Sequence, residues 1–127
     1  MDETRAIARL IERYFAALHS GDTAEIAAIF LPECDLIWAR GKGEYSHTAL
    51  PDYLGIVAGR PAPASAGFPR FGEILSIDLN GPDLARVLVD SAVQPRFYRD
   101  YLTLVRVADG WRIASKIYRL LRDESAG

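Results

Sequence analysis

The sequence predicts an α+β domain in which three N-terminal helices cover one face of a strongly curved antiparallel sheet, forming a cone. Apolar residues recur at helical spacing early in the chain, and the pattern changes to a period of two near residue 71. Asp109-Gly110 then joins two runs rich in β-branched and aromatic residues, which is a strong hairpin signal. Helices that precede strands in this way are typical of segregated α+β folds. The 127 residues, 50% of them hydrophobic, are expected to form a single domain, 1–127.

The first helix is expected where apolar residues lie three and four positions apart and so share one face. It should end at Gly21, because glycine readily adopts the left-handed conformation at a helix end. Asp22 is then a candidate N-cap for a second helix, with Glu25 completing a capping box, and Leu31-Pro32-Glu33 should stop that helix after Phe30. The apolar face of the first helix consists of Ile7, Leu10, Ile11, Tyr14, Phe15 and Leu18.

The middle of the chain predicts one short strand, one short helix and a loop. Leu36–Ala39 is an apolar run bounded by turn residues and is read as the strand, with Arg40–Gly43 as a loop. Pro51 suits the first turn of a third helix. Residues 59–67 are too rich in proline and glycine for a regular element.

The second half predicts four strands of a meander. Ala85–Val93 forms the second of them, and Tyr101–Val107 and Trp111–Tyr118 form the closing hairpin, while residues 119–127 are polar and should fray. In the first strand the alternation puts Phe71, Glu73, Leu75, Ile77 and Leu79 on one face and Ile74, Ser76 and Asp78 on the other.

Composition excludes several functional classes. The net charge of -2 and the pI near 5.6 provide no basic surface for nucleic acid. No apolar run approaches the roughly 20 residues that a membrane span needs, and the charged start is unlike a secretory signal. The single cysteine, Cys34, cannot form an intrachain disulfide, so we expect a cytoplasmic protein in which Cys34 is a small buried residue.

No motif indicates a cofactor or a metal. His19 and His47 are the only histidines, and neither has the neighbours of a metal site. No glycine-rich phosphate loop follows a strand, and no Ser-His-Asp set can be assembled.

A cone of this kind leaves an apolar cavity between the first helix and the sheet, which suits a small, largely apolar or aromatic molecule. Tyr14 is either a hydrogen-bond donor in that cavity or plain core, and Trp38 either stacks on a ligand or fills the base of the cone. Arg60 and Arg70 flank the proline-rich loop and suit an anionic ligand, unless they are simply solvated. The candidate ligand-binding residues are Tyr14, Trp38, Tyr53, Phe68, Arg70, Phe71 and Tyr118.

Asp100 and Lys116 are charged residues that interrupt the apolar pattern of the hairpin strands. A buried lysine needs an anionic partner, and Asp100 is the obvious one. A two-residue turn at Asp109-Gly110 pairs Thr103 with Lys116 and puts Asp100 on the opposite face. A three-residue turn pairs Leu102 with Lys116 and puts Asp100 on the same face. The sequence leaves both registers open, as it leaves open a structural or a catalytic role for the pair.

The chain resembles the nuclear-transport-factor-2-like superfamily, and within it the putative lumazine-binding family. The resemblance implies a cone fold and a flavin-like pterin ligand. It covers nearly the whole chain and is carried by Arg13-Tyr14-Phe15, Ser20-Gly21-Asp22, Arg60–Ala64, Ile74–Ile77, Asp100–Leu104, Gly110–Ile113 and Lys116.

The steroid isomerases of the same superfamily provide a comparison of individual residues. The resemblance places Tyr14 on their oxyanion-hole tyrosine and Trp38 on their general-base aspartate. Because the indole of Trp38 cannot accept a proton at neutral pH, this comparison argues against steroid isomerisation.

Three functions follow from the sequence. The first is a small-molecule-binding domain without a cofactor. The second is an isomerase, cyclase or dehydratase that uses Tyr14 with Asp100 or Lys116, both weak catalytic candidates. The third is an interaction module that forms a homodimer through the sheet face, on the expectation that Leu102, Leu104 and Arg106 lie on an exposed outer face.

Overall fold

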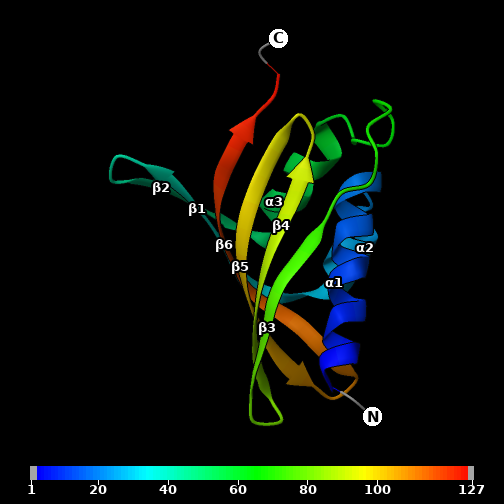
Figure 1. Ribbon diagram of the computed structural model, residues 1–127, viewed down its shortest axis with the longest axis vertical. Helices are drawn as coiled ribbons and strands as arrows, with labels where there is room; N and C mark the ends of the chain where they lie inside the picture. The colour runs from blue at the N-terminus through cyan, green and yellow to red at the C-terminus, as the bar shows by residue number, and fades with distance from the viewer. Residues whose placement is uncertain (1–2, 126–127) are drawn as a thin grey trace.

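The computed structural model describes residues 3–125, which form three helices packed against one face of a curved six-stranded sheet (Figure 1). The sheet order is β2-β1-β6-β5-β4-β3. All neighbouring strands are antiparallel except β1 and β6, which are parallel. The elements are α1 (Glu3–Ser20), α2 (Thr23–Ile29), β1 (Phe30–Gly41), β2 (Glu44–Ala49), α3 (Leu50–Gly59), β3 (Glu73–Asn80), β4 (Leu84–Val93), β5 (Arg96–Val107) and β6 (Gly110–Asp123).

The helix boundaries follow the local signals in the sequence. Gly21 has a φ of 70°, the left-handed conformation expected after α1. The Asp22 side chain caps α2 by accepting a hydrogen bond from the Glu25 backbone N–H at 3.0 Å. Pro51 lies in the first turn of α3, where its missing N–H costs nothing.

The sheet is larger than the sequence predicts. The prediction that the second helix includes Phe30 is wrong, because α2 ends at Ile29 and β1 begins at Phe30. Pro32 is accommodated because the pairing of β1 with β6 is interrupted between Phe30 and Asp35.

The edge strand β2 has no counterpart in the predicted elements, and β6 continues to Asp123 although residues 119–127 are predicted to fray. The segment Glu44–Ala49 is mostly exposed and carries no apolar alternation, so periodicity could not identify it. The end of β6 is held by pairing of Arg96 with Asp123. The expected fraying of residues 126 and 127 lies outside the described residues.

A bulge in β3 corrects the predicted faces of that strand. The register shifts between Ile74 and Ser76, so Ile74 pairs with Val89 and Ile77 pairs with Val87. Both isoleucines therefore face the core, although strict alternation assigned them to opposite faces.

A second bulge decides the register of the closing hairpin. The turn residues are Ala108 and Asp109, one position earlier than predicted, with Val107 paired to Gly110. The pairing then shifts by one residue between Thr103 and Leu104, because Ala114 has no partner of its own.

After this bulge Leu102 pairs with Lys116, and Asp100 lies two residues before Leu102 on the same face. Leu102 and Leu104 are fully buried, so their predicted exposure on an outer face is wrong. Asp100 and Lys116 therefore point toward the helices.

Candidate ligand-binding site

The interior of the cone contains a hydrogen-bonded tyrosine and carboxyl group. The Tyr14 hydroxyl, from α1, donates to Asp100 Oδ2, from β5, at 2.7 Å. Both residues are 0% exposed. The other carboxyl oxygen, Asp100 Oδ1, is buried and has no hydrogen-bond partner among the described residues. Such an acceptor is costly in a folded protein and calls for an explanation.

Lys116 lies in the same interior, on the adjacent strand. Its ammonium donates to the Tyr53 hydroxyl, from α3, at 3.2 Å and so does not satisfy Asp100 Oδ1. The Lys116 Nζ lies 5.3 Å, 5.2 Å and 4.7 Å from the ring centroids of Tyr14, Tyr53 and Tyr118. Three aromatic faces therefore stabilise this buried cation.

Burial shapes the acid–base behaviour of the cluster. It raises the pKa of Tyr14 well above 10.0, and the nearby negative charge of Asp100 adds to that effect. Burial opposes the charge on Lys116, but its interactions with Tyr14, Tyr53 and Asp100 outweigh burial and raise the pKa of Lys116 well above 10.5. At neutral pH the cluster thus holds a neutral phenol and a charged ammonium.

Three aromatic rings from the sheet continue the interior surface away from Asp100. Trp38 and Tyr118 stack with centroids 5.9 Å apart and planes at 19°. Tyr98 lies edge-on to Trp38 and to Tyr118 at 6.3 Å and 5.6 Å. They face the same side as Asp100, because Tyr98 lies two residues before it and Tyr118 pairs with it. The Arg40 guanidinium lies over the Trp38 ring, 3.8 Å from its centroid, so Tyr98 and Tyr118 provide the rest of this aromatic surface.

A surface pocket of about 400 Å³ reaches this aromatic surface at Tyr98. It lies between the loop after α3 and the turn from β4 to β5. Arg60 extends over the Tyr53 ring at 5.9 Å, which connects the pocket to the Lys116 side of the cluster. Two of the described residues that line the pocket are arginines, and none is acidic. The lining consists of Arg60, Pro61, Ala66, Phe68, Val93, Gln94, Pro95, Arg96, Tyr98 and Ser125.

The structure divides the residues that the sequence grouped in one cavity. Tyr14 and Tyr53 are buried in the packed core. Phe71 lines a pocket of about 590 Å³ with Phe97, and Phe68 lines both this pocket and the one at Tyr98. Arg70 lies apart from both, because its guanidinium donates to the carbonyl and the carboxylate of Glu12 on α1.

Tyr98 is the site residue that the sequence does not single out. The signal was present, since a strand residue two positions before Asp100 must share its face. Its importance depended on the register of the hairpin, which the sequence left open.

The surroundings of His47 and Cys34 indicate structural roles for both residues. His47 contacts Asp35 at 2.8 Å on the exposed surface. Cys34 is buried, and burial raises the pKa of its thiol to about 11. Within residues 3–125 no three His, Cys, Asp or Glu side chains gather closely enough to hold a metal ion. No helix in that range is long and apolar enough to cross a membrane.

The family model described as "Putative lumazine-binding" matches residues 2–119, which is nearly the whole chain. The chain belongs to the putative lumazine-binding family. The resemblance of the sequence to this family is thereby confirmed. A search of curated proteins finds no match.

Solved structures confirm the nuclear-transport-factor-2-like fold of this family member. A protein of unknown function from Shewanella baltica has a TM-score of 0.82 at 18% identity, covering 95% of each chain. One from Silicibacter pomeroyi has a TM-score of 0.75 at 23% identity, covering 92% of this chain and 94% of its own. A ketosteroid isomerase-like protein from Erwinia carotovora has a TM-score of 0.70 at 16% identity, covering 95% and 98%. At these identities the likeness establishes the fold alone.

Proposed function

We propose that this member of the putative lumazine-binding family binds a planar heterocycle that carries a ring N–H beside a carbonyl group. The observation that carries the proposal is Asp100 Oδ1, a fully buried acceptor without a partner among the described residues. A ligand N–H would satisfy it with a charge-assisted hydrogen bond. Pterin-like diones such as lumazine, and the related flavins, have this donor beside a carbonyl.

The rest of the cluster supports the same class of ligand. Lys116 and the Tyr53 hydroxyl supply donors for the ligand carbonyl, and the charge on Lys116 makes its hydrogen bond stronger. Trp38, Tyr98 and Tyr118 supply aromatic faces and edges for a flat ring.

The arginines of the pocket at Tyr98 favour a ligand with an anionic substituent. Arg60 and Arg96 line this pocket without an acidic neighbour in its wall. Arg96 contacts Asp123 at 3.4 Å, and Arg60 contacts the Tyr53 ring. A phosphate or carboxylate on the heterocycle would lie here while the ring reaches the cluster. Because Asp100 is fully buried, entry of the ring requires the covering side chains, Tyr98 among them, to move.

Titration calorimetry with lumazine, riboflavin and flavin mononucleotide tests the proposal. We expect saturable binding of at least one of them, and tighter binding of the mononucleotide than of riboflavin. The N,N-dimethylated lumazine, which has no ring N–H, should bind about tenfold more weakly than lumazine. Absence of binding by all of these compounds would contradict the proposed function.

Two variants form the matched comparison. Asp100→Asn keeps the shape but removes the charge of the acceptor, and should weaken binding about tenfold to a hundredfold. Asp78→Asn is the control, because Asp78 has a 66% exposed side chain on the outer face of the sheet. Equal affinities of the two variants would refute the role of Asp100.

The Tyr14–Asp100 contact also favours a second candidate function, acid–base catalysis on a small carbonyl compound. A buried phenol beside a carboxyl group can stabilise a developing enolate. Exchange of the α-protons of a cyclic enone in deuterated water, followed by NMR, tests this candidate. We expect exchange that Tyr14→Phe abolishes, and exchange no faster than in buffer would exclude it.

We further propose that a second copy of the chain covers the outer face of the sheet. Leu102 and Leu104, which were predicted to form that surface, are buried, but another apolar row crosses four adjacent strands there. It includes Tyr101 and Ile117, which are 52% and 42% exposed. The row consists of Ile37, Ile117, Tyr101 and Leu88.

Light scattering at micromolar concentration should report a dimer that Ile117→Arg dissociates. Ile56→Arg is the control, because Ile56 is 50% exposed on α3. A monomeric wild-type protein would refute this interface. We also propose a cytoplasmic location, motivated by the free thiol of Cys34, which cell fractionation would test.

A further inference from the structure

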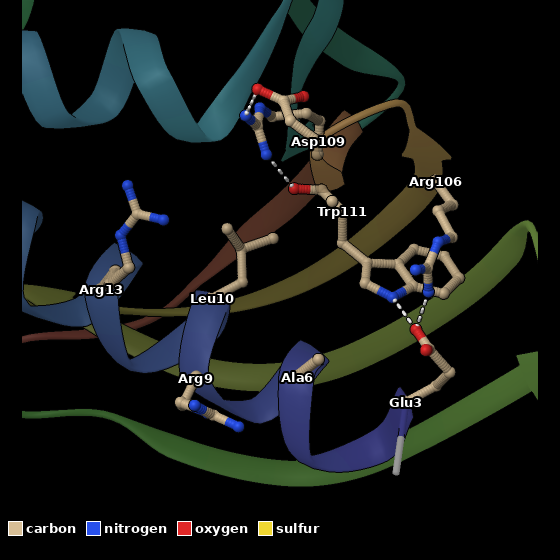
Figure 2. Close-up of a pocket in the computed structure, with 10 residues that line it drawn as sticks. Glu3, Ala6, Arg9, Leu10, Arg13, Arg106, Asp109 and Trp111 are labelled. Carbon is tan, nitrogen blue, oxygen red and sulfur yellow. Dashed lines mark hydrogen bonds and ion pairs between the residues drawn. The ribbon is translucent and has the colours of Figure 1, made fainter. Parts of the chain in front are cut away.

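A third pocket, of about 440 Å³, lies between α1 and the turn that joins β5 to β6 (Figure 2). None of the residues discussed above for the heterocycle site lines it. Its lining residues are Glu3, Ala6, Arg9, Leu10, Arg13, Arg106, Asp109, Gly110, Trp111 and Arg112.

The lining carries a surplus of positive charge although the whole protein has a net charge of -2. Four arginines face two carboxylates, Glu3 and Asp109. Glu3 accepts hydrogen bonds from Arg106 and, at 2.7 Å, from the Trp111 indole. Asp109 accepts from Arg112 at 3.0 Å. Both carboxylates are thus already engaged, each by one arginine of the lining.

The other two arginines are on α1. Arg13 is paired at 2.8 Å with Glu25, which lies outside the pocket. Arg9 is exposed, and among residues 3–125 no hydrogen bond or ion pair is found for its guanidinium. Its five N–H donors are therefore available to a ligand. The ion pairs of Arg13 and Arg106, whose side chains are 48% and 42% exposed, are weak, so these two groups can also reorient toward an anion.

The floor of the pocket is apolar. Leu10 and Trp111 are 5% and 4% exposed and lie across from each other in Figure 2, and Ala6 lies one turn before Leu10. Arg112 is held beside this floor, because its second guanidinium nitrogen donates to the Trp111 carbonyl at 2.7 Å. A ligand that used both features would combine an apolar body with an anionic group.

We propose that this pocket binds a small organic anion with an apolar body, of the aryl phosphate or aryl carboxylate class. The anionic group contacts Arg9 and the neighbouring guanidinium groups, and the aryl group packs on Leu10 and Trp111. The inference is independent of the proposed heterocycle site, because it rests on a different pocket.

The test is an NMR titration of the full chain with naphthyl phosphate and with naphthoate. The chain has two tryptophans, so two indole N–H signals are expected, and Trp38→Phe assigns them. The Trp111 signal should shift saturably with both probes. Absence of a saturable shift with either probe would overturn the proposal.

Two charge-removing variants on one helix provide the matched comparison. Arg9→Gln should weaken binding about fivefold, and Arg5→Gln, which removes an exposed arginine outside the lining, should leave the affinity unchanged. Equal weakening by both variants would mean attraction to the general charge of α1 and would refute the site.

Two further probes separate the roles of charge and apolar surface. Naphthalene methanol has no charge and inorganic phosphate has no apolar body, so each should bind more weakly than naphthyl phosphate. Equal binding of either probe would overturn the assigned ligand class. Asp100→Asn should leave the titration unchanged, so the heterocycle proposal and this one fail or survive separately.

Discussion

Replacement of Tyr14 by phenylalanine isolates the central hydrogen bond of the cone. The change removes one hydroxyl and leaves the ring in place, so it creates almost no cavity. Asp100 would then have both carboxyl oxygens buried without a partner, because only Oδ2 is satisfied now, by Tyr14 at 2.7 Å.

A hydrogen bond to a charged group contributes about 1.5–3 kcal/mol, and a buried charged group left unsatisfied costs at least as much. We therefore expect Tyr14→Phe to lower the free energy of unfolding by about 3 kcal/mol. Since small domains are stable by about 5–15 kcal/mol, the variant should still fold.

Urea unfolding followed by circular dichroism measures this cost, and a double-mutant cycle assigns it to the pair. In the Asp100→Asn background the bond is neutral and roughly half as strong, so Tyr14→Phe should cost about 1 kcal/mol there. Tyr45→Phe is the control, because Tyr45 is 71% exposed and should change stability by less than about 0.5 kcal/mol. A cost for Tyr14→Phe that is equal in both backgrounds would refute the reasoning.

Three further predictions follow from the packing and the pKa shifts. A Cβ at Gly72 would lie 2.2 Å from the buried Phe15 ring, so Gly72→Ala should lower the free energy of unfolding by about 1–3 kcal/mol in the same urea assay. The control is Gly55→Ala, which should be neutral or stabilising because a Cβ at Gly55 meets no atom within 4 Å. Because the pKa of Tyr14 is raised above 10.0 in the folded state, the unfolded chain loses this proton first, and stability should fall as the pH rises above about 10. Tyr14→Phe should flatten that decline in urea unfolding, and an unchanged slope would contradict the assignment. With the pKa of Cys34 raised to about 11, Ellman's reagent at about pH 8 should react with the folded protein much more slowly than with the urea-unfolded chain, and equal rates would show that Cys34 is accessible.

Local signals in the sequence determine the helical half of the molecule. The spacing of apolar residues from Ile7 to Leu18, the glycine at position 21 and the Asp22 cap each act over a few residues, and the structure confirms all three. The family resemblance and the cone fold also follow from the sequence and are confirmed.

Edge strands and bulges limit the prediction of the sheet. The strand Glu44–Ala49 is exposed on most of its length, so no hydrophobic pattern marks it. Irregular pairing in β3 breaks the alternation that would otherwise assign Ile74 and Ile77 to faces.

The candidate site shows most clearly what sequence alone decides. Asp100 and Lys116 are charged residues in apolar strands, so the sequence alone identifies them as candidate site residues. Their orientation depends on one residue of register, because side chains alternate between faces.

The turn at Ala108 and Asp109, followed by the bulge at Ala114, supplies that register and brings Asp100 to Tyr14, 86 positions away in the chain. Whether a bulge forms depends on how the whole sheet curves and packs under the helices, and no local pattern encodes that. The sequence by itself therefore determines which residues are chemically unusual, and only the tertiary structure decides that they meet inside the cone.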